Sequence, residues 1–129
     1  EVIFLGAVYD KEVVQSLRSH SMAYVHGHRV GGTNPSLVEA MGAGNPVLAH
    51  DNKYNRWVAG DAALYFASEQ EFGERLDWLI SSEDRRSDMS RGSRSRFEAM
   101  LTWPRVLAAY EAILSPFICD AYRLRPSNR

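Results

Sequence analysis

The fold is decided by the stretch His26–His50, with the sequence HGHRVGGTNPSLVEAMGAGNPVLAH. This stretch predicts the end of one strand, a glycine loop, a helix over 34–42 that carries a carboxylate, and a second strand over 46–49. Both strands are short and apolar, as buried parallel strands usually are. The order strand, helix, strand is therefore typical of a parallel β-α-β unit.

The same alternation continues on both sides of this unit. The predicted strands are Glu1–Leu5, Met22–His26, Pro46–Ala49 and Ala63–Phe66. Helices are predicted over 10–20, 34–42 and 55–60, and the pattern after residue 66 is helical throughout. We therefore expect an α/β fold, a Rossmann-like doubly wound parallel sheet with extra C-terminal helices.

The C-terminal half carries several helix signals. Ser68 and Glu71 have the spacing of a capping box, and Thr102 is placed to cap a last helix. That helix has an apolar stripe and is expected to end at Pro116, because proline interrupts a helix interior. The expected organisation is one domain over residues 1–116 and a tail over 117–129.

The composition limits the class of protein. The chain has 129 residues, 45% of them hydrophobic, and 15 basic against 16 acidic side chains, so it has no bulk attraction to nucleic acid. No apolar run approaches the roughly 20 residues that span a bilayer, and no signal peptide is recognisable. The single Cys119 excludes an internal disulfide. We expect a cytoplasmic location, with the inner face of the membrane as an alternative.

The start of the helix over 34–42 is a candidate phosphate site. Asn34 is a good N-cap and Pro35 a good first residue, so the unpaired N–H groups would be those of Ser36 and Leu37. Unpaired N–H groups and the helix dipole favour an anion at this position. The alternative is a well-capped helix with no ligand, and the sequence leaves both open.

Residues on either side of this N-terminus extend the candidate site. Gly31 and Gly32 would let a ligand approach the backbone closely, and the hydroxyl groups of Thr33 and Ser36 could bind phosphate oxygens. Glu39 could accept hydrogen bonds from two vicinal hydroxyl groups of a sugar. Taken alone, Glu39 is better explained as a solvated side chain or as the acceptor of a loop N–H, but the combination suggests a nucleotide-sugar site.

Further candidates follow the predicted strands, where open α/β sheets bind ligands. His26 ends one strand and is placed to line a cleft, and Gly6–Val8 follow the first strand, where Val8 or Tyr9 could pack on a base. His26 and His28 have a spacing that can chelate, but no third ligand lies nearby, so we expect no metal. For each of these residues an ordinary loop role is the alternative.

An arginine-rich stretch lies at residues 85–96. Acidic residues interrupt it and no aromatic residues alternate with it, so a solvated helix face is expected rather than a nucleic-acid surface. Peripheral contact with an anionic lipid surface is the weaker alternative.

At this point the chain resembles the donor-binding half of a family-4 retaining glycosyltransferase of the GT-B fold. The segments that carry the resemblance are VIFLGAVYDKEVVQSL, MAYVHGH, GGTNPSLVEAMGAGNPVLAHD and TWPRVLAAYEAIL. The third is similar to the family's most characteristic stretch, E-x-F-G-x-x-x-x-E-A-M-A-x-G-x-P-V-x-a. The variants VHGH, GGTNPSLVEA and AHDNKYNR resemble those of bacterial rhamnosyltransferases of polysaccharide assembly.

The resemblance implies roles for individual positions. Glu39 matches the second glutamate of the family's E-x7-E motif, which holds the ribose hydroxyl groups, and the N–H groups near Ser36 and Leu37 match those that bind the diphosphate. Residues 6–10, including Gly6 and Val8, match the turn that packs on the nucleobase. Residues 26–31 match the loop that faces the transferred sugar, which makes His26 the candidate catalytic residue.

Two departures from the family pattern qualify these roles. Gly31 stands where the first motif glutamate would fall. The family's phosphate-binding Arg and Lys would precede Glu1, as would the acceptor-binding domain. The chain also opens on a strand without an initiating Met, so we expect a fragment of a longer protein that is inactive alone.

Two functions remain open from the sequence. The first is the donor half of a glycosyltransferase that moves a sugar, with rhamnose as one candidate, from a nucleoside diphosphate sugar to a saccharide or lipid-linked acceptor, without a cofactor. The second is a non-catalytic nucleotide-binding or scaffold module of a glycan-assembly complex. Exposed apolar surface left for the acceptor domain suggests a dimer as a further option. A dinucleotide-binding unit is disfavoured, because no G-x-G-x-x-G follows the first predicted strand.

Overall fold

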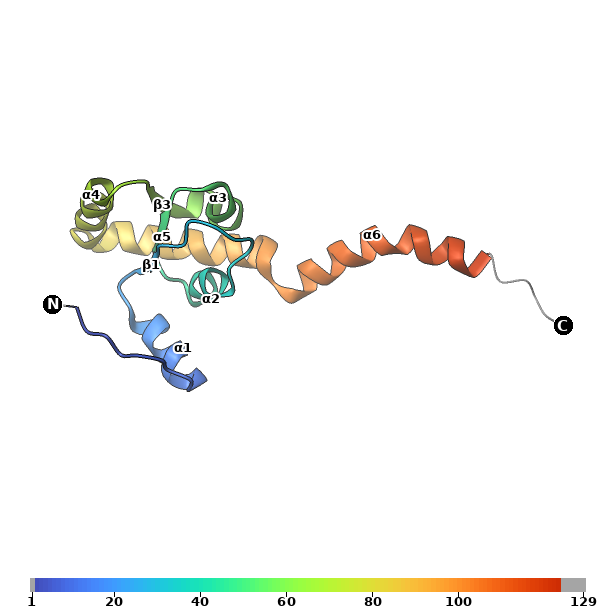
Figure 1. Ribbon diagram of the computed structural model, residues 1–129, viewed down its shortest axis with the longest axis horizontal. Helices are drawn as coiled ribbons and strands as arrows, with labels where there is room; N and C mark the ends of the chain where they lie inside the picture. Colours follow the sequence, from blue (N-terminus) through green and yellow to red (C-terminus); the bar gives the residue numbers. More distant parts are fainter. Residues whose placement is uncertain (1, 124–129) are drawn as a thin grey trace.

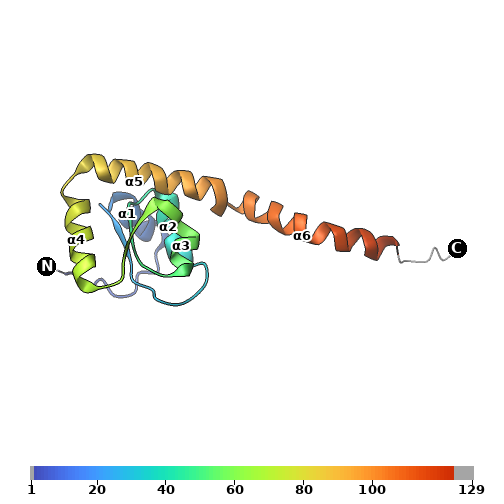
Figure 2. The same cartoon turned by 90° about the horizontal axis from the view of Figure 1, so that it is seen from above.

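The computed structural model describes residues 2–123, and the side chains of residues 2–117. One parallel sheet is formed in the order β1-β2-β3, by Tyr24–His26, Val47–His50 and Ala63–Phe66. The helical elements are α1 (Lys11–His20), α2 (Pro35–Ala43), α3 (Lys53–Ala59), η1 (Gly60–Ala62), α4 (Glu69–Ile80), α5 (Glu83–Arg96), the π-helix η2 (Phe97–Leu101) and α6 (Trp103–Arg123). Figures 1 and 2 show the strands between α4 on one side and α2 with α3 on the other.

The core lies where α2 and α3 meet the sheet. Leu37 and Met41 of α2 and Val47 of β2 are fully buried, and Val58 of α3 joins the same cluster. Each such side chain contributes about 1.5–3 kcal/mol by burial. Helix α2 is therefore held firmly against the sheet, which fixes the position of every residue on its outer face.

The predicted fold class is confirmed, since parallel strands alternate with helices that flank the sheet. Asn34 caps α2 as expected, because its side-chain oxygen accepts the Ser36 N–H at 3.0 Å. The Ser68 hydroxyl accepts the Glu71 N–H, as predicted for the start of α4. The third predicted strand starts one residue later than expected, and β3 has the predicted bounds.

The strand predicted for Glu1–Leu5 is absent among the described residues 2–5. The side chains in this segment are exposed, Phe4 to 92%. A strand needs a neighbour for its backbone N–H and C=O groups. In the described chain β1 pairs only with β2, and no strand pairs with residues 2–5.

The sequence predicts that the last helix ends at Pro116, but in the structure the helix continues past this residue. Helix α6 runs through this residue and, in both views, extends away from the rest of the molecule (Figures 1 and 2). Proline inside a helix is tolerated more easily where no tight packing opposes it, and Ile113 and Phe117 on either side are mostly exposed. The boundary proposed at residue 116 therefore lies within a helix, and the division into domain and tail stays a prediction. Among the described residues no helix is long and apolar enough to cross a membrane.

The arginine-rich stretch is a solvated face only in part, which corrects the expectation from the sequence: Arg91 is exposed, whereas other arginines contact neighbouring helices. Helix α5 crosses the ends of three other helices, and its arginines donate to their last carbonyl groups. Arg86 binds the carbonyls of Leu79 and Ile80 in α4, Arg94 that of Ala43 in α2, and Arg96 those of Trp57 and Val58 in α3. Cations at helix C-termini satisfy unpaired carbonyls and the helix dipole. These guanidinium groups link α5 to the ends of α2, α3 and α4, and peripheral contact with a lipid surface stays a prediction.

Candidate functional site

A pocket of about 400 Å³ lies between α1, α2 and the segment before α1. We call it the α1–α2 pocket, and its lining residues are Val8, Tyr9, Lys11, Val14, Gln15, Arg18 and Glu39. Two candidate residues from distant parts of the sequence, Val8 and Glu39, meet here. The pocket thus combines an apolar wall with a carboxylate and two cations.

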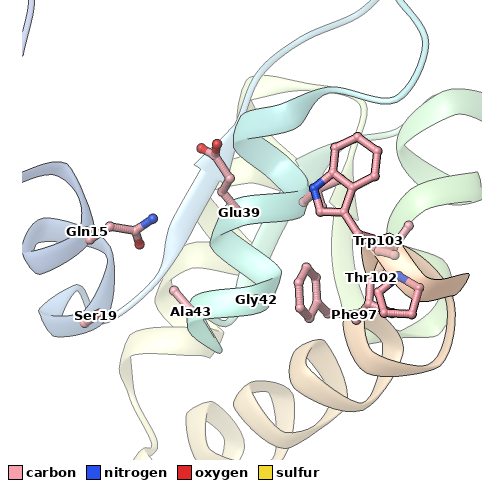
Figure 3. Close-up of a pocket in the computed structure, with 11 residues that line it drawn as sticks. Gln15, Ser19, Glu39, Gly42, Ala43, Phe97, Thr102 and Trp103 are labelled. Atoms are coloured by element: carbon pink, nitrogen blue, oxygen red, sulfur yellow. The ribbon is translucent and has the colours of Figure 1, made fainter. Parts of the chain in front are cut away.

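Glu39 lies at the mouth of this pocket and is paired with Arg18. The Arg18 Nη2 atom is 2.6 Å from Glu39 Oε2, and the two side chains are 16% and 49% exposed. A groove of about 580 Å³ adjoins the pocket, and Glu39 and Gln15 line both. Figure 3 shows Gln15 of α1 and Glu39 of α2 facing one another, with Phe97 and Trp103 on the other side of α2. Glu39 is accessible to a ligand, but it is not an isolated charge.

The N-terminus of α2 differs from the expectation of unpaired N–H groups. The Ser36 N–H donates to Asn34 Oδ1 at 3.0 Å, and the N–H groups of Leu37 and Val38 donate to the Asn34 carbonyl at 3.1 and 3.2 Å. Asn34 also accepts the Ser36 hydroxyl at 2.7 Å. The cause is Asn34, because its side-chain oxygen already accepts the Ser36 N–H. An anion would have to displace this side chain to bind the same N–H group. The helix dipole remains available.

The glycine loop after β1 is tied to the loop after β2. Asn55 is buried, and its Nδ2 atom donates to the carbonyls of His28 and His50 at 3.0 and 2.8 Å. Asn52 donates to the same His28 carbonyl at 2.9 Å. Gly31 has a φ of 126°, which side chains rarely adopt, so glutamate at this position would strain the backbone. Gly32 and Thr33 are exposed on the same loop.

His26 is placed at the end of β1 as predicted, but it does not face an open cleft. Its side chain is 1% exposed, its ring stacks on His28 with centroids 4.7 Å apart, and its Nδ1 atom lies 3.4 Å from the Tyr24 hydroxyl. Burial lowers the pKa of His26, and the neighbouring His28 lowers it further. The ring is therefore neutral near pH 7. Its Nε2 atom has no hydrogen-bond partner among the described residues. The catalytic role of His26 stays a prediction.

A comparison with known protein families shows to which family the chain belongs. The sequence model described as glycosyl transferases group 1 matches residues 1–96. The chain belongs to this family. No curated protein and no solved structure matches the chain. Membership assigns transfer of a sugar from a nucleotide sugar, with a donor and an acceptor as the partners.

In this glycosyltransferase domain the candidate residues fall into two groups. Val8 and Glu39 share the α1–α2 pocket, whereas Ser36, Thr33, Gly31 and His26 lie outside its lining. Gly6 precedes the pocket and has a φ of 70°. The N-terminus of α2 and the glycine loop thus do not line the pocket that holds Glu39.

Sequence reasoning missed the basic residues of the pocket, Lys11 and Arg18. The signal available was Glu39 itself, because a carboxylate in an apolar stretch calls for a partner. Its partner could not be located from spacing, because Arg18 belongs to a different helix. In the described part of the chain, no group of three or more His, Cys, Asp or Glu side chains could hold a metal ion.

The edge of the sheet beyond the glycine loop is occupied by an internal ion pair. Arg56 donates to both oxygens of Asp51, at 2.5 and 2.7 Å, and holds the pKa of that carboxyl below its ordinary value. The Arg56 guanidinium also lies 4.3 Å from the centre of the Tyr65 ring, and burial raises the pKa of Tyr65 to about 12. Asp51 is therefore paired with a residue of α3.

Proposed function

We propose that this chain is the donor-binding half of a retaining glycosyltransferase, and that a second domain binds the acceptor. The donor is a nucleoside diphosphate sugar, for which rhamnose is the first sugar to test, and the acceptor is a saccharide or lipid-linked saccharide. The observation that carries this proposal is the α1–α2 pocket, which is lined both by the apolar Val8 and by the Glu39 carboxylate. These two features suit a nucleobase and a ribose.

The proposed chemistry assigns the chain an electrostatic task. The bond between the sugar C1 and the diphosphate oxygen breaks, and its electron pair stays on the diphosphate. A bond from C1 to an acceptor hydroxyl oxygen forms on the same face of the sugar, and the hydroxyl proton passes to the leaving diphosphate. Glu39 binds ribose hydroxyl groups, and the N-terminal dipole of α2 stabilises negative charge on the leaving diphosphate. His26 and the glycine loop are proposed to lie on the sugar side. Because the acceptor side belongs to the second domain, we expect no turnover from this chain alone.

The proposal is tested by ligand-detected NMR of the chain with dTDP, UDP and GDP. We expect one nucleotide to bind, and Glu39→Ala to weaken that binding about tenfold, since a hydrogen bond to a charged group contributes roughly 1.5–3 kcal/mol. Glu74→Ala is the matched control, because Glu74 is also a helical glutamate with a hydrogen-bonded partner but lies on α4. Unchanged binding by Glu39→Ala would show that the assigned role is wrong.

A second candidate is a non-catalytic module of a glycan-assembly complex. Two observations favour it: Gly31 replaces the first glutamate of the motif, and the N–H groups at the start of α2 are already bonded. Under this candidate the wild-type chain binds none of the three nucleotides. A protein partner would then co-purify with it.

A further inference from the structure

Arg18 occupies a place in the α1–α2 pocket that the proposed donor site does not yet explain. Its guanidinium is mostly covered, whereas the Glu39 carboxylate that it contacts at 2.6 Å is half exposed. The cation therefore lies on the inner side of the pair and the anion at the opening. An ordinary surface pair has both partners in water and contributes little.

The main chain of Arg18 is anchored more firmly than that of an ordinary helix end. Its carbonyl accepts the Nδ2 atom of Asn45 at 2.7 Å and the hydroxyl group of Ser21 at 3.0 Å. Asn45 is itself 3% exposed and adjoins β2, so it links the end of α1 to the sheet. The main chain of Arg18 is thus fixed to the sheet side of the domain, while its side chain extends to Glu39 of α2.

We propose that Arg18 is a positioning residue that orients Glu39 for the ribose of the donor, an inference that rests on the proposed function. A carboxylate has about four acceptor positions on two oxygens. Arg18 occupies one position on Oε2, and Oε1 carries no hydrogen bond from the described residues. Oε1 is left to accept the hydroxyl groups of a ribose.

Arginine suits this role better than lysine. Its planar guanidinium is always charged and fixes direction as well as charge, whereas an ammonium group is a point charge on a flexible stem. Arg18→Lys should therefore preserve the charge of the pair but lose part of the orientation. Arg18→Met removes both and keeps the length of the side chain.

The test compares two ligands with the full chain: the nucleoside diphosphate that the wild type binds and its 2′,3′-dideoxy analogue. We expect Arg18→Met to weaken binding of the natural nucleotide about tenfold, which corresponds to 1.4 kcal/mol, and that of the dideoxy analogue less than about twofold. Arg18→Lys should fall between wild type and Arg18→Met. The double variant Arg18→Met/Glu39→Gln should bind no more weakly than Glu39→Gln alone. The reason is that both substitutions remove the same interaction between Glu39 and the ribose.

The matched control is Arg91→Met. Arg91 also pairs with a carboxylate, that of Asp88, but both side chains are exposed on α5. Circular dichroism establishes that each variant is folded. An equal loss for both ligands would mean that Arg18 contacts the base or the diphosphate, and would overturn the inference. Unchanged or tighter binding by Arg18→Met would also overturn it, with the proposed function intact. If the wild type binds no nucleotide, both the inference about Arg18 and the proposed function are overturned.

Discussion

His26 ends β1, and its imidazole lies beneath His28 with almost no exposed surface. The sequence predicts the location of His26 correctly but not the accessibility of the ring. Burial, and then the charge of His28, lower its pKa. The folded protein therefore binds a proton at this site less readily than the unfolded chain, whose histidines titrate near about pH 6.5.

This difference makes stability depend on pH in a defined direction. The stabilisation is complete above about pH 6.5, and it is lost as the pH falls toward the lower pKa of the folded state, because the unfolded chain then binds more protons. We expect the free energy of unfolding, measured by urea titration, to fall between about pH 7.5 and 5.5, and to fall less in His26→Gln. His20→Gln is the control, since His20 is exposed on α1. An equal dependence on pH in wild type and His26→Gln would contradict the assignment.

At the same scale, the sequence predicted those side chains whose partners are near in the chain. Asn34 was identified as a cap because its acceptor and the Ser36 N–H are two residues apart. Arg18 was missed because its contact with Glu39 exists only after α1 and α2 have packed. Two predictions for the start of α2 exclude one another: if Asn34 caps the helix through the Ser36 N–H, that N–H is not unpaired.

Among the elements, α5 was the most misread. Its polar, arginine-rich sequence is typical of a solvated helix. The spacing of its arginines does not reveal that the C-terminal ends of three other helices lie against it. The structure assigns Arg86, Arg94 and Arg96 to those ends. Gly44 shows how close the contact is, because a Cβ atom there would lie 2.2 Å from Arg94 Nε.

We therefore expect Arg96→Ala to destabilise the protein by about 1–2 kcal/mol, because two charge-assisted hydrogen bonds to the end of α3 are lost. Arg91→Ala, on the same helix, should change stability by less than about 0.5 kcal/mol, since its pair with Asp88 is exposed. Chemical denaturation of the two variants beside the wild type measures the difference. Equal effects would mean that the carbonyl contacts of α5 contribute nothing specific.

Elements with local signals were predicted well, and those that depend on distant pairing were not. The caps at Asn34 and Ser68 locate two helices from a few residues each. The apolar run at residues 2–5 has the composition of a strand, but a strand exists only with a neighbour, which the described chain does not provide. The composition of this run could not reveal whether a neighbour was present.

For the whole molecule, the described chain divides into a packed domain and a helix that leaves it. The sheet with α2 and α3 holds most of the fully buried side chains, whereas Leu107, Tyr110, Ile113 and Leu114 of the apolar stripe of α6 are at least half exposed. That stripe was predicted from periodicity, which shows amphipathicity but not what covers the apolar face. Helix α6 packs mainly against η2, at its own first turn.

This division predicts two levels of protection in native-state hydrogen exchange. Isolated helices are marginal in water, so amides of α6 beyond Val106 should open locally and exchange at least about 100-fold faster than those of β2. Amides of β2 should exchange only through unfolding of the domain, because the strand is central and its side chains are buried. Leu48→Ala, a core change expected to cost about 2–5 kcal/mol, should accelerate exchange in β2 and leave α6 unchanged. Equal protection of α6 and β2 in the wild type would mean that the helix is packed in solution, and that its apolar stripe is covered there.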